Sequence, residues 1–253
     1  SEHRKYRWIM KRYVITGGCG FIGSHVVQLL KSKCKEVAII DKITNRELID
    51  QQALLQNVQH FYMDISDPEL MEKALLSDDI VIHLAAQSHV DVSFKNPVQT
   101  TVSNVVGIHS LLAACVKKGV KKIVIMSTDE VYGSTEQIVD VNLLNPANPY
   151  SASKAAADMI VSAYKTMHPE ITITTLRSNN IAGPGQFINN IIPRFSVLGL
   201  LKKKFTLHGD GSAMRRYLWV KDAAEAIWLL AENATQSRIY HIGHKDKFSN
   251  LEI

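Results

Sequence analysis

The chain has 253 residues, of which 46% are hydrophobic, and a formal net charge of +5 at pH 7. A chain of this size can bury one sizeable core, either as a single large domain or as one domain with a small appendage. Its longest apolar runs are strand-sized, far short of the roughly 20 residues that a membrane helix needs, so we expect no membrane segment. Lys and Arg are scattered along the chain, so we expect no nucleic-acid surface, although a modest positive field suits a small diphosphate ligand.

The cysteines and the start of the chain bear on the compartment. Cys19, Cys34 and Cys115 are odd in number and form no CxxC pair, which fits a reducing environment. Residues 1–12 are basic and contain no apolar run of signal-peptide length. We therefore expect a cytoplasmic protein.

Short β-branched runs alternate with longer stretches of helical periodicity over the first 178 residues. This pattern is typical of βαβ units around a buried parallel sheet. In chain order, we expect strands at 12–16, 36–41, 58–62, 80–84, 122–127 and 172–177. We expect helices at 21–33, 68–76, 98–118 and 149–168. The predicted fold class is α/β, a doubly wound parallel sheet of the Rossmann type.

The strict alternation fails after Ser178. Residues 179–190 are rich in Gly, Pro and Asn, and such residues mark turns and loops. A predicted helix at 190–202 and a short strand at 206–208 follow. This segment indicates a second, smaller lobe.

The last part of the chain regains regular patterns. A predicted helix at 221–232 and a strand at 239–242 are regular enough to return to the main sheet. We therefore expect a cofactor domain over 1–178, joined by 221–242, and a small substrate-binding lobe over 179–220 and 243–253.

A glycine-rich segment, TGGCGFIG at residues 16–23, lies between the first predicted strand and the first predicted helix. Glycines there allow a tight turn, close approach of the backbone to a pyrophosphate and close helix packing, and the helix N-terminus supplies amide donors. Asp41 ends the second strand, where a carboxylate can accept hydrogen bonds from both ribose hydroxyls and would repel a 2′-phosphate. The pattern predicts NAD rather than NADP, although Lys42 or Arg46 could neutralise that phosphate.

Tyr150 and Lys154 are four residues apart at the start of a helix that Pro149 opens, so they project from one face. A phenol of pKa about 10 is a poor base near neutrality, but an adjacent ammonium favours the phenolate. We expect Lys154 to lower the Tyr150 pKa and to hold the nicotinamide ribose. Alone, this spacing also suits a surface pair.

The segment STDEVYG at residues 127–133 follows the fifth strand, at the sheet edge where ligands of open α/β folds bind. Together with the glycine loop and YSASK at 150–154, it resembles the extended short-chain dehydrogenase/reductase family. Its Thr-Asp-Glu triplet is similar to that of the dTDP-glucose 4,6-dehydratases. The resemblance extends from about Arg12 to Asn250.

The resemblance implies a role for each member of this group. Tyr150 would take the proton of the sugar 4-hydroxyl while hydride passes from C4 to NAD, and Thr128 would steady that oxygen. Glu130 would then remove the acidified C5 proton, Asp129 would protonate the departing C6 hydroxyl, and the hydride would return to C6. Two carboxyls in these roles need environments that separate their pKa values.

The resemblance also implies binding residues. Asp64 and Ile65 would contact adenine, and the guanidinium of Arg215 suits a diphosphate. The implied cofactor-binding residues are Gly17, Gly20, Phe21, Ile22, Gly23, Asp41, Asp64, Ile65, Ala85, Ala86, Ser127, Tyr150 and Lys154. The implied substrate-binding residues are Ser88, Asn180, Asn190 and Arg215.

This chain departs from the family pattern near the expected sugar site. Residues 187–193 read FINNIIP, where the family has a Glu-Lys pair at the positions of Asn189 and Asn190. Ala182 replaces a common tyrosine, and Arg216 replaces an aspartate. Since the chain ends at Ile253, we expect its substrate lobe to be shorter than in relatives.

The predicted function is that of a nucleotide-sugar 4,6-dehydratase acting on dTDP-glucose or UDP-glucose. A 4-epimerase or decarboxylase of the same family remains an alternative, because it shares Tyr150 and Lys154 but needs no acid and base at 129 and 130. A non-catalytic NAD-binding relative is a third possibility.

No HExxH or finger-like spacing occurs among the ten histidines, so no metal is expected. By analogy, we expect a homodimer formed through the helices at 98–118 and 149–168.

Overall fold

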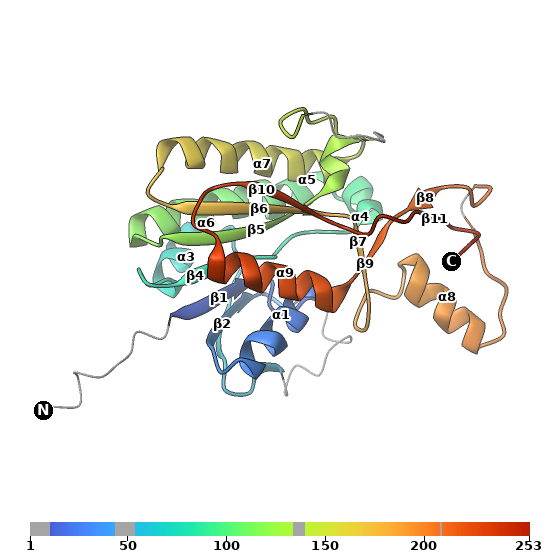
Figure 1. Cartoon of the computed structure of the whole chain (residues 1–253), viewed down its shortest axis with the longest axis horizontal. Helices are drawn as coiled ribbons and strands as arrows, with labels where there is room; N and C mark the ends of the chain where they lie inside the picture. Colours follow the sequence, from blue (N-terminus) through green and yellow to red (C-terminus); the bar gives the residue numbers. More distant parts are fainter. Residues whose placement is uncertain (1–10, 44–53, 134–139, 208) are drawn as a thin grey trace, which may run out of the picture.

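The computed structural model describes residues 11–43, 54–133, 140–207 and 209–253. A seven-stranded parallel sheet with helices on both faces forms its centre (Figure 1). The strand order is β10-β6-β5-β4-β1-β2-β3. These strands are β1 Arg12–Thr16, β2 Glu36–Asp41, β3 Gln59–Tyr62, β4 Ile80–His83, β5 Lys122–Thr128, β6 Thr172–Ser178 and β10 Ile239–Ile242. The predicted α/β fold class is confirmed.

The order of the strands reverses beside β1. From β1 the chain runs outward through β2 and β3, and it then returns to the other side of β1 to form β4. Thr16, at the end of β1, is in register with Ile40 of β2 and His83 of β4. The carboxyl ends of β1 and β4 therefore flank the switch point, where open α/β sheets bind their ligands.

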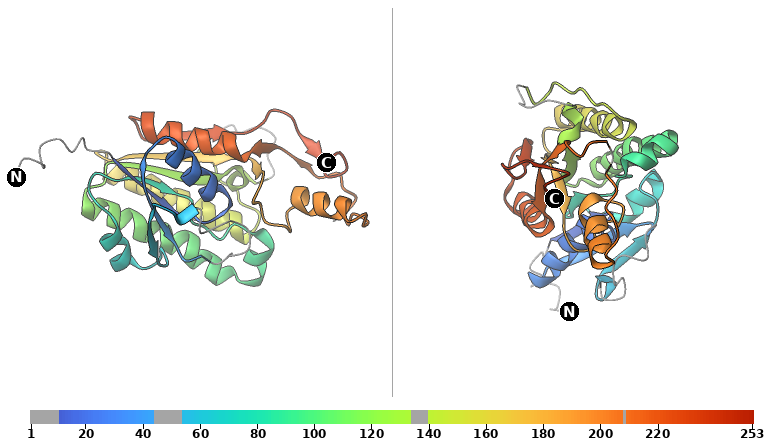
Figure 2. Two further views of the ribbon diagram at one scale, coloured as in Figure 1. Left: turned by 90° about the horizontal axis from the view of Figure 1, so that it is seen from below. Right: turned by 90° about the vertical axis from the view of Figure 1, so that its right-hand side faces the viewer.

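Two layers of helices cover the sheet (Figure 2). On one face, α1 (Phe21–Ser32) packs against α9 (Val220–Asn233), and both contribute to one apolar core with β1. The second core, on the other face, includes residues of three further helices. These helices are α3 Pro68–Ala74, α6 Gly107–Lys118 and α7 Pro149–Met167.

Local signals in the sequence explain where these helices begin and end. Asn148 caps α7 in a reciprocal capping box with Ser151, and Pro149 occupies the first turn. Asp67 caps α3 by accepting from the N–H groups of Glu69 and Leu70. Such caps satisfy amides that a helix leaves without partners.

The predicted helix over 98–118 is divided into α5 (Pro97–Thr101), a π-helical segment η2 (Val102–Val106) and α6. The π-helical segment contains Asn104, which is 2% exposed. Its Oδ1 accepts from the N–H of Gln87 at 2.7 Å, and its Nδ2 donates to the hydroxyl of Ser153 at 2.8 Å. The widened turn thus joins the loop after β4 to α7, which agrees with the tendency of such segments to occur at functional sites.

Short elements form the end of the molecule beyond the main sheet. They are α4 Val90–Lys95, η3 Asp129–Tyr132, α8 Ile191–Leu200, the parallel pair β7 Asn180–Ala182 and β9 Tyr217–Trp219, and the antiparallel pair β8 Met214–Arg215 and β11 Phe248–Ser249. The predicted strand at 206–208 is wrong at Thr206 and Leu207, and His208 lies outside the described residues. The Thr206 hydroxyl instead accepts from Arg194, and the local ladder is made by β8 and β11. None of the described helices is both long and apolar enough to cross a bilayer.

Candidate active site

A cleft of about 800 Å³ opens at the carboxyl end of the sheet. Loops after β1, β4, β5 and β6 form its inner end, and α8 and β8 form its outer end. The predicted site residues that line it are Phe21, Ile22, Ala86, Ser88, Ser127, Thr128, Glu130, Tyr150, Lys154, Asn180, Asn190 and Arg215. The others do not line it: they are Gly17, Gly20, Gly23, Asp41, Asp64, Ile65, Ala85 and Asp129.

The glycine loop turns tightly between β1 and α1. Gly17 has φ of +71°, and a Cβ on it would lie 2.7 Å from the backbone of Ala85. A Cβ on Gly23 would lie 2.1 Å from the carbonyl oxygen of Gly17. Side chains are therefore excluded from this turn, and α1 begins there without an acidic residue in its first turn. Backbone N–H groups that are not covered by side chains, at a helix N-terminus, can bind a pyrophosphate.

Asp41 holds this loop in place. Its Oδ2 accepts from the N–H of Cys19 at 2.9 Å, and its Oδ1 accepts from the N–H of Ile43 at 2.7 Å. Each carboxylate oxygen has a further lone pair, so hydrogen bonds from ribose hydroxyls remain feasible. The carboxylate thus fixes the loop and is placed at the end of β2 where the cofactor ribose is expected.

The two residues expected to contact adenine, Asp64 and Ile65, lie in different environments. Asp64 forms an ion pair with Lys42 at 2.9 Å and accepts two hydrogen bonds from Ser66. Burial raises the pKa of Asp64, but the bonds from Lys42 and Ser66 outweigh it, so the net shift is downward. Ile65 is 7% exposed and belongs to a hydrophobic core. Lys42 thus has Asp64 as its partner, in an ion pair whose two side chains are partly exposed. Arg46 lies outside the described residues.

The Thr-Asp-Glu triplet forms the turn after β5. The hydroxyl of Thr128 accepts from the N–H of Glu130 at 3.2 Å and so caps η3. Asn179 donates to Asp129 at 2.5 Å, and Asn148 donates to Glu130 at 3.5 Å. Glu130 lines the cleft, whereas Asp129 is turned toward Asn179.

Both carboxyl groups bind protons more tightly than usual. Burial raises the pKa of Asp129, although bonds from Asn179 and Thr128 oppose the shift. Burial also raises the pKa of Glu130, and the like charge of Asp129 adds to the shift. The pair therefore lies nearer to the range in which proton transfer operates at neutral pH.

Tyr150 and Lys154 line the cleft from the first turns of α7. Lys154 is 7% exposed and donates from Nζ to the carbonyl of Met126 at 2.7 Å. Burial lowers the Lys154 pKa, and the charge of Asp158 opposes this shift. The expected lowering of the Tyr150 pKa is not found in the chain alone. Burial and the charges of Glu130, Asp129 and Asp158 raise it, while Met126 engages the ammonium.

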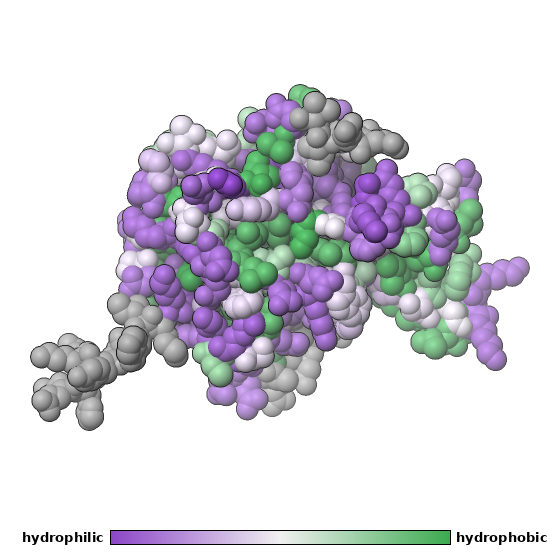
Figure 3. Space-filling view, viewed as in Figure 1, coloured by the Kyte–Doolittle hydropathy of each residue, from purple (hydrophilic) through white to green (hydrophobic). Residues whose placement is uncertain are grey.

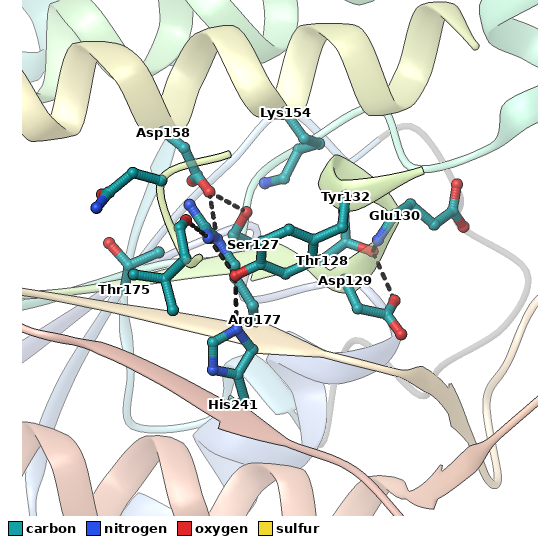
Figure 4. Close-up of polar contacts among 12 residues, drawn as sticks. Ser127, Thr128, Asp129, Glu130, Tyr132, Lys154, Asp158, Thr175, Arg177 and His241 are labelled. Atoms are coloured by element: carbon teal, nitrogen blue, oxygen red, sulfur yellow. Dashed lines mark hydrogen bonds and ion pairs between the residues drawn. The ribbon is translucent and has the colours of Figure 1, made fainter. Parts of the chain in front are cut away.

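Residues outside the predicted site form a polar network behind Ser127 (Figure 4). Arg177 donates from Nε to Oδ2 of Asp158 at 2.8 Å, and Ser127 donates to the same oxygen at 3.0 Å. The hydroxyl of Tyr132 bonds both Arg177 and His241, the latter at 2.7 Å. Asp158 could have been recognised from its position four residues beyond Lys154, which places it on the same face of α7.

Side chains outside the predicted set also line the outer end. They are Gln186 and Asn189 before α8, Arg194 on α8, and Tyr217 on β9. Apart from Asn189, no pattern in the sequence marked them, because they come together only where α8 and the short strands line the same cleft. Among the described residues, no three His, Cys, Asp or Glu side chains are grouped so as to hold a metal ion.

A parallel sheet with a glycine loop at its switch point and a carboxylate at the end of β2 defines a dinucleotide-binding Rossmann protein. The sequence profile of the NAD dependent epimerase/dehydratase family matches residues 13–243. The chain belongs to this family, and NAD is its cofactor, as predicted.

Individual proteins that the chain is similar to are nucleotide-sugar enzymes. It is 38% identical to the dTDP-D-glucose 4,6-dehydratase of Dictyostelium discoideum, over 96% of this chain and 61% of that protein. It therefore spans about three fifths of that relative's length. It is also similar to the crystal structure of DesIV, the dTDP-glucose 4,6-dehydratase of Streptomyces venezuelae solved with NAD bound. That match has a TM-score of 0.87 and 33% identity and covers 95% of this chain and 78% of the other.

A family member with a different activity is almost equally similar in structure. The UDP-glucose 4-epimerase of Thermotoga maritima matches with a TM-score of 0.86 and 28% identity, over 95% of this chain and 79% of the other. The overall fold therefore does not separate the two activities, and the side chains of the cleft must do so.

Proposed function

We propose that this protein is an NAD-dependent nucleotide-sugar 4,6-dehydratase, which converts dTDP-glucose or UDP-glucose to the 4-keto-6-deoxy sugar nucleotide. The observation that carries the proposal is the pair Asp129 and Glu130, whose pKa values are both raised by burial, beside Tyr150. An epimerase needs the tyrosine and lysine but not an acid and a base at these positions. The identity to dehydratases supports the same choice.

The inner end of the cleft suits the cofactor. The glycine loop and Asp41 would hold the pyrophosphate and ribose of NAD, and Lys154 would meet the nicotinamide ribose. Bound NAD would supply the redox chemistry, taking up the electron pair that leaves C4 and giving it back at C6. The ion pair of Lys42 with Asp64 supports NAD over NADP, because it occupies the nearby lysine.

The chain's own groups would move the protons. Tyr150, as phenolate, would accept the 4-hydroxyl proton, and the Thr128 hydroxyl would donate to the oxygen left at C4. The raised pKa of Tyr150 in the chain alone means that the phenolate depends on further positive charge beside it. The nicotinamide cation would supply that charge.

The carboxyl pair would carry out the elimination of water. Glu130 lines the cleft and would remove the C5 proton, which the 4-ketone makes acidic. Asp129 would protonate the leaving C6 hydroxyl, for which it must turn from Asn179 toward the cleft. A raised pKa helps this acid, because it keeps more of the protonated form at a given pH.

The outer end of the cleft suits the sugar nucleotide. Asn190 at this end, with Ser88 and Asn180 on the loops after β4 and β6, offers hydrogen-bonding groups, and Arg215 offers a planar cation for the diphosphate. We assign residues 179–220 and 243–253 to the substrate-binding lobe on this basis.

The experiment that tests the function is incubation of the purified protein with NAD and dTDP-glucose, and separately with UDP-glucose. We expect the sugar nucleotide to lose one water, as measured by mass spectrometry. The isosteric Glu130→Gln variant, which cannot act as a base, should lower the rate of loss by about 10²-fold or more.

Three other results would contradict the proposal. Interconversion of glucose and galactose forms without loss of mass would assign a 4-epimerase. Binding of NAD without turnover of either nucleotide would assign a non-catalytic relative. A Glu130→Gln variant as active as the wild type would remove the carboxyl pair from the mechanism.

We further propose that the protein is a cytoplasmic homodimer. Exposed apolar side chains on α5 and α7 support the dimer, since Val98 is 75% exposed and Met159 is 64% exposed. Cys19, Cys34 and Cys115 are free, which supports a reducing compartment. A monomer in sedimentation at micromolar concentration would contradict the dimer.

A further inference from the structure

A buried ion pair lies directly behind the cleft. Asp158 on α7 and Arg177 on β6 meet at 2.8 Å, and their side chains are 5% and 3% exposed. Charges taken from water at this depth carry a desolvation cost that an ion pair does not always recover. An apolar pair of similar volume would fill the same space, so the charges call for a reason other than packing.

The carboxylate of Asp158 reaches the wall of the cleft. Its Oδ2 accepts from the Ser127 hydroxyl at 3.0 Å as well as from Arg177. Ser127 lines the cleft at the end of β5, next to Thr128. Asp158 therefore fixes the rotamer of a side chain that faces the ligand.

Asp158 also lies on the same face of α7 as Tyr150 and Lys154, since the three are spaced by four residues. Lys154 and Asp158 both point from α7 toward the ends of β5 and β6 (Figure 4). The ammonium of Lys154 donates to the carbonyl of Met126, and Arg177 and Ser127 occupy Oδ2 of Asp158. Asp158 thus acts on Lys154 through its charge and leaves it facing the cleft.

We propose that Asp158 is a positioning residue of this site, which holds Ser127 in the cleft wall and keeps the neighbouring Lys154 in its charged form. Arg177 in turn fixes Asp158 against β6. The proposal rests on the proposed function for its catalytic meaning, because Lys154 is expected to hold the cofactor only when charged. The effect of Asp158 on the charge of Lys154 can be measured without any turnover.

The charges around this pair are few near neutral pH. His83 of β4 faces Lys154 but is neutral, because burial and then the charge of Lys154 lower the pKa of His83 to about 3. Tyr150 is neutral in the chain alone, since its pKa is raised. Lys165 of α7 is also close to Asp158, and burial lowers its pKa to about 8 against the opposing effect of Asp158. Removal of the Asp158 charge should therefore act on Lys154 and Lys165 in the same direction.

The test is competitive labelling of lysines with 1-fluoro-2,4-dinitrobenzene in the protein without substrate, from pH 6 to pH 10. Only an uncharged amine reacts, so the labelling of each lysine follows its deprotonation, and peptide mass spectrometry separates the sites. In the isosteric Asp158→Asn variant we expect labelling of Lys154 at pH 8 to rise about threefold or more, because its opposite charge is gone. Exposed Lys221 serves as the internal reference and should not change.

A second variant covers the risk that Arg177, once unpaired, prevents folding. Asp158→Asn combined with Arg177→Gln leaves a neutral pair of similar shape. Loss of the Arg177 cation offsets part of the effect, so we expect a smaller rise at Lys154 in the same direction. Unchanged labelling of Lys154 in a folded variant, by circular dichroism and melting temperature, would overturn the proposal. Asp158→Glu, which restores the charge, should return the labelling toward that of the wild type.

Activity then gives an independent readout. If the dehydratase function holds, the whole pH profile of turnover in Asp158→Asn should move to lower pH. The reason is that the carboxylate raises the pKa of both Tyr150 and Lys154. A purely structural role would lower turnover at every pH without moving the profile. Because labelling needs no turnover, failure of the proposed function would leave this inference testable.

Discussion

The two ends of the cleft are built in contrasting ways. At the inner end, Ser127 and Lys154 are buried. Ser127 on β5 donates to Asp158, and Lys154 on α7 donates to the carbonyl of Met126. At the outer end, Arg215 is exposed and its guanidinium reaches only the carbonyl of Met214 among the described contacts. Apolar side chains are also exposed there (Figure 3). Leu200 of α8 is 84% exposed.

The inner end is therefore suited to the chemical step, and the outer end to recognition of the ligand. Groups at the inner end are held by the fold before a ligand arrives, which is how preorganised sites lower a barrier. Groups at the outer end lie on short strands and one helix with fewer partners, so the ligand must order them. Damage to the inner end should therefore reduce stability or turnover, whereas changes at the outer end should alter affinity.

The largest expected effect comes from breaking the inner end at the glycine loop. In Gly23→Ala the new Cβ would lie 2.1 Å from the carbonyl oxygen of Gly17, which is backbone and cannot move aside cheaply. We expect a loss of roughly 3 kcal/mol in the free energy of unfolding, or no folded protein. Denaturant unfolding measures this.

The matched control lies at the outer end. Gly199 is an exposed glycine of α8, and a Cβ there would meet only Phe205 at 3.6 Å. Gly199→Ala should stabilise the protein by about 0.5 to 1 kcal/mol, because alanine restricts the unfolded chain and favours helix. A Gly23→Ala variant as stable as the wild type would contradict the view that the glycine loop belongs to the rigidly held inner end.

A smaller effect is expected at the outer end. Arg215→Gln removes the cation assigned to the diphosphate, and we expect about tenfold weaker binding of dTDP or UDP, equal to about 1.4 kcal/mol. Calorimetric titration measures this. The melting temperature and NAD affinity should not change. Arg238→Gln, an exposed arginine beside Gln236, is the control. Equal affinity in the two variants would place the diphosphate elsewhere.

The smallest effect sharpens the comparison within the inner end. The amide of Asn148 bonds Glu130 and lowers its pKa, in opposition to burial. Asn148→Ser keeps a capping hydroxyl for α7 but removes this donor, so the Glu130 pKa should rise. Glu130 must be ionised to act as a base. As the pH is lowered, turnover in the variant should therefore begin to fall at a higher pH than in the wild type.

The measurement is the pH dependence of turnover. We expect a reduction of about threefold on the acid side in Asn148→Ser, with an unchanged plateau at higher pH. A uniform reduction over all pH values would instead indicate a displaced helix. A profile identical to that of the wild type would show that the 3.5 Å contact has no influence on Glu130.

The cofactor half of the fold could be predicted because its signals are local. Buried β-branched runs, the glycine loop and the proline that opens α7 each specify structure over a few residues. The strands β1 and β2 occur at their predicted bounds. The short pairs β7 with β9 and β8 with β11 were missed, because two or three residues carry no periodic signal and their partners are far apart in the chain.

The site shows the same limit. Tyr150, Lys154 and Glu130 were predicted to share a cleft, and they do line it. The orientation of Asp129 toward Asn179 and the raised pKa of Tyr150 depend on burial, which no spacing reveals. Arg177 ends a predicted strand, yet its bond to Asp158 needs the side-by-side placement of β6 and α7.

The packing of α9 on α1 has a consequence for how the chain folds. The core on the α3, α6 and α7 face draws on residues from Val14 to Ile173, so it can be completed while the rest of the chain is still being synthesised. The opposite core contains Ala223, Ala224 and Ile227 of α9, which cover apolar residues of α1. Until α9 emerges, the apolar residues of α1 and of the sheet that α9 covers stay exposed. Such late, long-range closure slows folding and exposes the nascent chain to aggregation, which makes this face the natural place for a chaperone to act.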